Sequence, residues 1–189
     1  MSNPWEAAGV LFGVVAVYLT VRQNVWCWPV GIVNVGLFIV VFAQARLYAD
    51  MGLQVVYVGL CLYGWRKWLH GGPGHGTLAV SRTPRATLAG LVLLGAVFAA
   101  ALGLTLYRHT DASIPFWDAS TASFSLVAQL MQARKWVENW IVWIVVDAVY
   151  VGMYVHKELF PTAGLYAAFL VLAILGLREW RGSLAAAGR

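Results

Sequence analysis

The stretch WPVGIVNVGLFIVVFAQ at residues 28–44 decides the fold class, because it is apolar for nearly its whole length and carries no charged side chain. A helix that crosses a membrane needs roughly 20 predominantly apolar residues. The whole chain has the same character: 61% of its 189 residues are hydrophobic, only 11% are charged, and the mean hydropathy is +0.72. Soluble domains carry about 25% charged residues. The sequence therefore predicts an all-α integral membrane protein with no separate soluble domain.

Apolar runs separated by charged residues predict seven transmembrane helices. They lie at residues 5–21, 28–44, 51–66, 86–107, 117–133, 138–155 and 161–178. The one evident linker spans residues 70–85, where HGGPGHG and SRTPR interrupt the helical pattern. The N-terminus lacks the positive charge and cleavage site of a secretory signal peptide, so we expect the first span to be retained.

A duplication is visible when the chain is aligned with itself at an offset of 112 residues. Residues 5–68 then pair with residues 117–180 without a gap and are identical at 18 of 64 positions. Because each copy holds three helices, the helix between them makes the copies parallel, a 3+1+3 arrangement of transporters whose site lies between the halves. We expect a first repeat at 1–69, a linker and linker helix at 70–112, and a second repeat at 113–189. Identities include Trp5 with Trp117, Arg22 with Arg134, Trp28 with Trp140, Gly64 with Gly176 and Trp68 with Trp180.

Positive charges gather in alternate loops of the predicted topology. One side of the membrane receives three of the 13 Lys and Arg residues, namely Arg46, Arg108 and Lys157, and the other side receives the rest. Short loops rich in Lys and Arg stay in the cytoplasm, which places the N-terminus outside and the C-terminus inside. The net charge of +5 therefore marks topology, and we expect no nucleic-acid partner.

A stripe of aromatic residues around one carboxylate marks the sixth span. Trp140, Trp143, Asp147, Tyr150 and Tyr154 follow the spacing of one helix face. An acidic residue at the centre of a membrane helix costs about 2.5 to 3.5 kcal/mol on insertion scales, so it should face protein or water. Asp147 is thus predicted to contact a ligand or a proton. The alternative is a carboxylate that packs helices by accepting a hydrogen bond from a neighbouring hydroxyl.

The aligned positions of the first repeat keep the first tryptophan, Trp28, but hold apolar residues in place of the other four. A single asymmetric ligand needs different chemistry from each half, whereas a purely structural duplicate tends to keep similar groups. We therefore take Trp28 as a candidate site residue, together with Asn34, which lies one position from the counterpart of Asp147.

The fifth span has a second polar stripe, formed by Asp118, Thr121, Ser125, Gln129 and Gln132. Gln129 is the best candidate of this stripe to meet a ribose or base edge. Gln54 and Tyr57 in the third span offer a similar amide and phenol. Helix packing remains the alternative for all of these side chains, because polar groups often bond between membrane helices.

Enzyme signatures are lacking. There is no phosphate-binding loop, no HExxH and no GxSxG, and the four histidines form no evident ligand set. We therefore expect no enzyme activity, no catalytic residue, no metal and no cofactor.

Three segments are distinctive: LYADMGLQVVYVGLCLYGWRKW at residues 47–68, the WxxWxxxD pattern of the sixth span, and TAGLYAAFLVLAILGLREW at residues 162–180. Together they resemble the PnuC family of vitamin transporters over nearly the whole chain. The resemblance implies a fold like that of the SWEET sugar transporters, and uptake of nicotinamide riboside across the bacterial inner membrane by facilitated diffusion with alternating access. It also implies that a cytoplasmic kinase traps the substrate, and that relatives carry thiamine, riboflavin or deoxynucleosides on the same scaffold.

The chemistry of the candidate residues suits such a ligand. Nicotinamide riboside is a flat cation joined to a ribose, which calls for aromatic faces and for amide or carboxylate partners. Trp140, Trp143, Tyr150, Gln54, Gln129 and Asp147 supply that set. Thiamine would be satisfied equally well, and a non-transporting sensor or scaffold is the second hypothesis. The predicted partners are a small vitamin and membrane lipid, while proton coupling and a homo-oligomer stay open.

Overall fold

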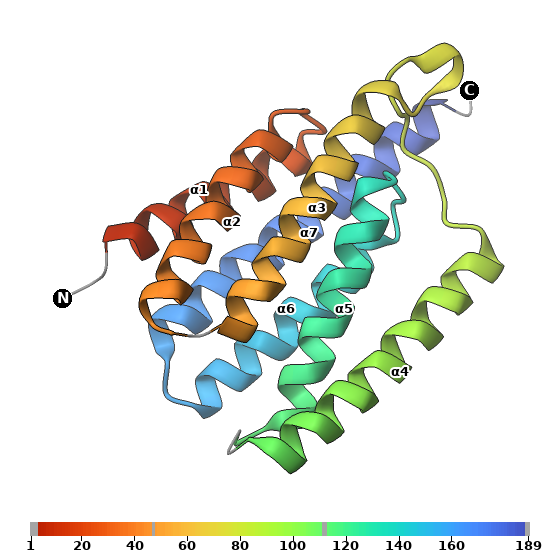
Figure 1. Cartoon of the computed structure of the whole chain (residues 1–189). Helices are drawn as coiled ribbons and strands as arrows, with labels where there is room; N and C mark the ends of the chain where they lie inside the picture. Colours follow the sequence, from red (N-terminus) through yellow and green to blue (C-terminus); the bar gives the residue numbers. More distant parts are fainter. Residues whose placement is uncertain (1–3, 47, 111–112, 188–189) are drawn as a thin grey trace. The chain divides into compact units, whose positions relative to one another are not determined.

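Helices form almost all of the chain in the computed structural model, which describes residues 4–46, 48–110 and 113–187. Seven α-helices lie in these ranges, with a short 3₁₀ turn, η1 (Pro73–His75), after the third (Figure 1). This confirms the predicted all-helical architecture. The helices are α1 (Pro4–Val21), α2 (Cys27–Gln44), α3 (Tyr48–His70), α4 (Arg85–His109), α5 (Pro115–Ala133), α6 (Asn139–His156) and α7 (Phe160–Ala187).

Most helix ends agree with the predicted spans within two residues, but α3 and α7 are longer. Past the predicted end at residue 66, α3 continues through Lys67 to His70, and past residue 178, α7 continues through Arg181 to Ala187. Charged residues end an apolar run without ending a helix, because Arg and Lys are good helix formers. Among the described residues, five helices are long and apolar enough to cross a membrane, namely α1, α2, α4, α6 and α7.

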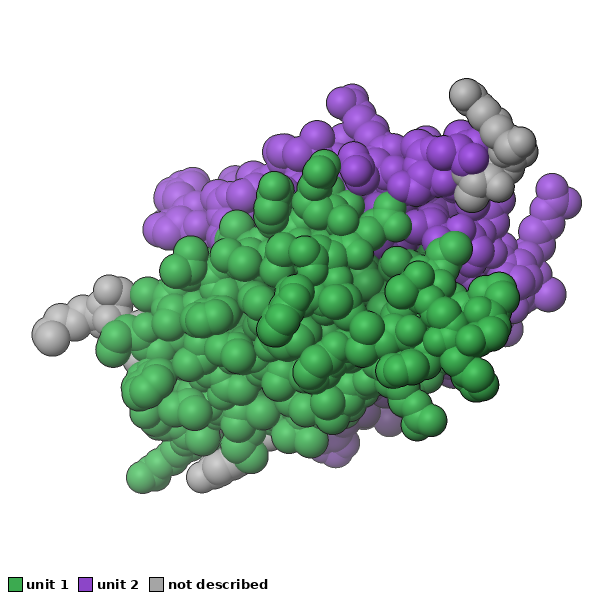
Figure 2. Space-filling model, turned by 90° about the horizontal axis from the view of Figure 1, so that it is seen from above, with its two compact units in different colours: residues 1–79, 133–135 green, residues 80–132, 136–189 purple. Residues whose placement is uncertain are grey.

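The chain divides into two compact units (Figure 2). Unit 1 comprises residues 1–79 with 133–135, and unit 2 comprises residues 80–132 with 136–189. In unit 1, α2 packs against both α1 and α3 (Figure 1). In unit 2, α6 packs against α7.

A pair of tryptophans meets edge to face in each unit. In unit 1, the ring centroids of Trp28 and Trp68 are 5.3 Å apart and the rings are perpendicular. In unit 2, Trp140 and Trp180 repeat this arrangement at 5.4 Å. All four side chains are buried. A glycine of the neighbouring helix, Gly64 or Gly176, lies so close to the first ring of each pair that a Cβ atom would overlap it.

Turn residues that pair at the repeat offset share an unusual backbone conformation. Gln23 after α1 and Lys135 after α5 have φ angles of 54° and 51°. Arg46 after α2 and Glu158 after α6 both have a φ of 58°. Non-glycine residues adopt this left-handed conformation uncommonly. Each pair of residues is separated by the 112-residue offset of the sequence duplication.

Small residues let α4 approach α5 within unit 2. Gly95, Ala99 and Gly103 are buried on one face of α4. The Ser123 hydroxyl of α5 donates a hydrogen bond of 2.7 Å to the Gly95 carbonyl. A Cβ atom at Gly103 would press into the ring of Phe116. Close approach at small residues and bonds from hydroxyls are typical of helices that pack in membranes.

Lys135, in the turn after α5, joins the end of α3 to the linker in unit 1. Its Nζ donates to the Leu78 carbonyl at 2.9 Å and lies 4.4 Å from the centroid of the Trp68 ring. Burial lowers the pKa of the Lys135 ammonium, because loss of water disfavours the charged form. The carbonyl and the indole face offset part of that cost.

The linker is also bonded in unit 2, to the start of α6. The Val137 amide donates to the Ser81 carbonyl at 2.9 Å. The amide and the hydroxyl of Thr83 both donate to one Glu138 carboxylate oxygen, at 2.8 Å each. The linker at residues 70–85, predicted as a break in helical structure, is therefore held in place by hydrogen bonds.

We expect Glu138→Ala to lower the free energy of unfolding by about 1 to 3 kcal/mol, because two hydrogen bonds to a charged acceptor are lost. Thermal unfolding in detergent measures the effect. Glu179→Ala is the matched control, since that side chain is exposed. Equal losses in the two variants would contradict a specific role for the Thr83 contacts.

Candidate functional site

The first residue of the α6 stripe, Trp140, is committed to packing inside unit 2. Its ring is 1% exposed and meets Trp180 of α7. Trp28 has the same surroundings in unit 1, where it meets Trp68. The indole Nε1 atoms of Trp28 and Trp140 are buried without a hydrogen-bond partner in the described ranges. Both predicted site residues therefore have a packing role, and each keeps an indole N–H that donates no hydrogen bond to the described residues.

Trp143 turns toward α5, not α7. Its Nε1 donates a hydrogen bond of 3.2 Å to Oε1 of Gln132, the next-to-last residue of α5. This bond lies in the plane of the indole ring and leaves the two π faces uncovered by it. The ring is half-buried.

Asp147 lies midway along α6 and is 4% exposed. Within the part of the chain that the structure describes, its carboxylate forms no hydrogen bond and no ion pair. Buried polar groups are nearly always hydrogen-bonded, and an ionisable residue in a membrane helix is usually functional. Among the described residues, no hydroxyl is bonded to Asp147, and its role as a ligand contact or as a packing residue stays a prediction.

The lower part of the stripe joins a cluster of tyrosines in unit 2. The ring of Tyr150 is 4.4 Å from Tyr166 of α7 and 5.9 Å from Tyr154, measured between centroids. The Tyr150 hydroxyl lies near the hydroxyls of Thr121 and Ser125 in α5. Tyr150 therefore links all three helices.

The polar stripe of α5 meets the α6 side of unit 2 at three levels. At one end, Asp118 lies 3.8 Å from the Lys157 ammonium, measured between Oδ1 and Nζ. Thr121 and Ser125, which lie near the Tyr150 hydroxyl, come next, and the bond between Gln132 and Trp143 lies at the other end. Gln129 belongs to this stripe and is half-buried.

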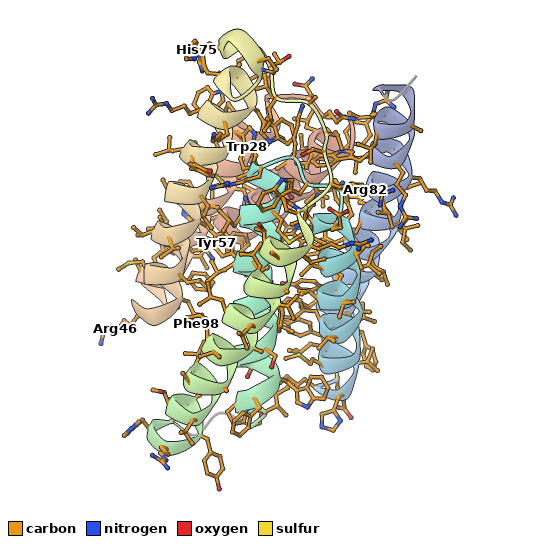
Figure 3. All side chains as sticks on the ribbon, turned by 90° about the vertical axis from the view of Figure 1, so that its right-hand side faces the viewer. Trp28, Arg46, Tyr57, His75, Arg82 and Phe98 are labelled. Carbon is orange, nitrogen blue, oxygen red and sulfur yellow. The ribbon has the colours of Figure 1, made fainter. Side chains whose placement is uncertain are left out.

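The predicted residues of unit 1 lie on α2 and α3. The Asn34 amide nitrogen donates to the Gly9 carbonyl of α1 at 2.7 Å, so it joins these two helices and keeps its own carbonyl oxygen as an acceptor. Gln54 and Tyr57 are half-buried and one turn apart on α3. Figure 3 shows Tyr57 between the two ends of that helix.

Sequence reasoning missed Tyr166 as a candidate. Its ring contacts both stripe tyrosines of α6 and, at 5.9 Å between centroids, Phe169. The duplication carried a usable signal, because the 112-residue offset pairs Tyr166 with Gln54, a residue already singled out.

Helices long and apolar enough to cross a membrane, together with buried polar side chains such as Asp147, are those of a multi-pass membrane protein. The family model that matches is described as "Nicotinamide mononucleotide transporter" and covers residues 3–182. The chain belongs to this family.

Individual relatives agree with that assignment. The nicotinamide riboside transporter PnuC of Escherichia coli (strain K12) is 26% identical over 94% of this chain and 85% of its own length. The riboflavin/roseoflavin transporter RibM of Streptomyces davaonensis is 28% identical over 93% of this chain and 83% of its own length. A crystal structure of the vitamin B3 transporter PnuC superposes with a TM-score of 0.75 at 19% identity, and covers 96% of this chain and 82% of that one.

These comparisons confirm the resemblance to PnuC stated from the sequence. The chain is a membrane transporter and not an enzyme. The solved structure shows that the fold is shared.

Proposed function

We propose that this chain carries nicotinamide riboside across the bacterial inner membrane by facilitated diffusion. The observation that carries the proposal is the buried Asp147 carboxylate, which has no partner among the described residues and shares a helix face with Trp143. A flat cationic ring and a ribose together match an indole face and a carboxylate acceptor. The name of the Escherichia coli relative supports this substrate. A cytoplasmic kinase that phosphorylates the imported nicotinamide riboside would keep it inside the cell.

The strongest proposed substrate contacts lie in unit 2. Trp143 stacks on the cationic ring, and the Asp147 carboxylate and the Gln129 amide form hydrogen bonds with the ribose and the carboxamide. The complete proposed set is Trp140, Trp143, Asp147, Tyr150 and Gln129 in unit 2, with Trp28, Asn34, Gln54 and Tyr57 in unit 1.

We infer that the chain is a SWEET-like 3+1+3 protein with repeats at 1–69 and 113–189, and that it works by alternating access. Three observations support this. The tryptophan pairs of the two units have nearly the same geometry, and the left-handed turn residues recur at the same offset. The bounds of α2 and α6 also differ by 112 residues at both ends.

The proposed topology has the N-terminus outside and the C-terminus in the cytoplasm, because ten of the 13 Lys and Arg residues fall on the C-terminal side. Lipid is the proposed neighbour of the exposed apolar side chains of α4. They include Leu93, Leu94, Val97 and Phe98, the last of which is labelled in Figure 3.

Riboflavin is the second candidate substrate, because RibM is as similar to this chain as the PnuC relative is. Riboflavin is flat but uncharged, so it would use the aromatic faces without a cation–π contribution. Competition binding with nicotinamide riboside, riboflavin, thiamine and nicotinamide separates the candidates.

Uptake into proteoliposomes tests the proposed function. We expect saturable entry of labelled nicotinamide riboside that stops when inside and outside concentrations are equal. A pH gradient alone should drive no accumulation of the unmodified substrate. Accumulation of unmodified nicotinamide riboside to a higher concentration inside than outside would refute facilitated diffusion. Entry of riboflavin but not of nicotinamide riboside would show that riboflavin is the substrate.

Trp143→Ala and Trp140→Ala should separate binding from folding. We expect Trp143→Ala to weaken nicotinamide riboside binding by about 1 to 2 kcal/mol, since a desolvated cation–π contact is lost. Trp140→Ala and Trp180→Ala should each lower stability by about 3 to 5 kcal/mol, because a buried indole is removed. Calorimetric titration and thermal unfolding of each variant give the two quantities. Equal binding losses in stable Trp143→Ala and Trp180→Ala proteins would contradict the distinction.

A further inference from the structure

The bond between Gln132 and Trp143 has no counterpart in unit 1. At the 112-residue offset, Gln132 pairs with Thr20 and Trp143 pairs with Gly31. The Thr20 hydroxyl donates to the Ala16 carbonyl of its own helix at 2.9 Å. Unit 1 therefore has neither the ring nor the amide acceptor at these places.

The residue beside Gly31 also differs between the two repeats. In unit 1, a Cβ atom at Gly31 would lie 3.7 Å from Sγ of Cys61, so the thiol lies beside the glycine. The residue that pairs with Cys61 in unit 2 is Ala173, which is 1% exposed. Unit 2 therefore has a larger side chain at the first of these two paired positions and a smaller one at the second.

Trp140 shows what a retained packing residue looks like, because its counterpart Trp28 keeps the same kind of partner. Trp143 differs from Trp140 in both respects. Its counterpart, Gly31, has no side chain, and its Nε1 is bonded to Gln132, whose counterpart in unit 1 is a threonine. The pair is an addition to unit 2 alone. A difference of this kind suits recognition of an asymmetric ligand better than it suits helix packing.

We propose that Gln132 is a positioning residue that orients the Trp143 ring for the substrate, an inference that rests on the proposed function. An indole held only at its Cβ atom can turn about two side-chain torsions. A hydrogen bond to Nε1 acts in the ring plane, so it fixes the plane and leaves both faces for stacking. The ring is then pre-organised, and less freedom is lost when a flat ligand binds.

Gln132→Met tests the proposal, because methionine keeps the length of the side chain and removes the acceptor. In full-length protein, we expect the Kd for nicotinamide riboside to rise by about threefold to tenfold, the effect of one hydrogen bond. In a Trp143→Phe background, the same substitution should change the Kd little, since the two residues act as a pair. Gln132→Glu keeps an acceptor oxygen and should restore much of the affinity. Thr20→Val, at the paired position of unit 1, is the matched control and should leave the Kd unchanged.

A spectroscopic signal distinguishes positioning from a general structural effect. With ¹⁵N-labelled tryptophan, the indole N–H resonance that disappears in Trp143→Phe should shift in Gln132→Met and stay in place in Thr20→Val. An unchanged Kd for Gln132→Met, with intact binding in the natural protein, would overturn this inference alone. Failure of the natural protein to bind nicotinamide riboside would overturn the proposed function, and this inference with it.

Discussion

Gly64→Ala and Gly176→Ala are each expected to lower the free energy of unfolding by about 1 to 3 kcal/mol, the usual cost of inserting a methyl group into a packed core. At both positions a Cβ atom would overlap the six-membered part of a buried indole, that of Trp28 or Trp140. Neither ring can move away, because each is held edge to face by a second tryptophan. Thermal unfolding in detergent measures the loss.

Two other helical glycines are matched controls for these substitutions. Gly59 lies in α3 and Gly164 lies in α7, and nothing would meet a Cβ atom within 4 Å at either place. Alanine there should be neutral or stabilising by up to about 1 kcal/mol, because it is the better helix former. Adding Trp28→Phe to Gly64→Ala should recover part of the loss, since the smaller ring relieves the overlap. Equal effects at all four glycines would show that the overlap does not determine stability.

The helices were predictable from the sequence because charge interrupts hydropathy at nearly every helix end. The two long exceptions, α3 and α7, continue through Arg and Lys residues that leave an apolar window but not a helix. The linker was predictable as an interruption only. Its hydrogen bonds to Val137 and Glu138 join residues about 55 positions apart, and no local pattern announces them.

The sequence predicted which candidate residues share a helix face. It did not predict which neighbouring helix each of them contacts. Periodicity placed Trp140 and Trp143 on one face of α6, yet the first packs against α7 and the second bonds to α5. A face spans an arc wide enough to touch two neighbours, and spacing alone does not say which neighbour covers which residue. Asn34 shows the same limit, because its amide bonds to α1.

The duplication supplies what periodicity cannot. Phe38 lies against Gly9 in unit 1, and at the same offset the Tyr150 hydroxyl lies near Thr121 in unit 2. A contact present in both units serves the packing of two helices in each unit, even when its polarity differs. Groups without any counterpart are the better candidates for ligand chemistry, and by that criterion Asp147 and Trp143 stand apart from Trp140 and Tyr150.

Asp147→Ala is expected to weaken nicotinamide riboside binding by about tenfold, whereas Asp147→Asn should bind nearly as well as the natural protein. The reason is the burial of this position. Asp147 pairs with Val35 of unit 1 at the 112-residue offset, and both side chains are buried. An ionised carboxylate paired with a cation at such a place would lose water on both partners. A side-chain oxygen can accept a hydrogen bond from a ribose hydroxyl without any charge pairing. Asparagine keeps one such acceptor oxygen in its amide.

Titration of both variants with the cationic ligand and with a neutral isostere decides between the two roles of Asp147. If the carboxylate pairs directly with the cation, Asp147→Asn loses affinity by tenfold or more, because removing one member of a buried charge pair costs about 2 to 5 kcal/mol. That loss would be confined to the charged ligand. If the oxygen accepts a ribose hydroxyl, the alanine variant loses affinity for both ligands alike and the asparagine variant for neither. Asp147→Val, which copies the residue of unit 1, should fold well and bind no better than Asp147→Ala, so that a binding loss in a stable protein is assigned to the missing acceptor.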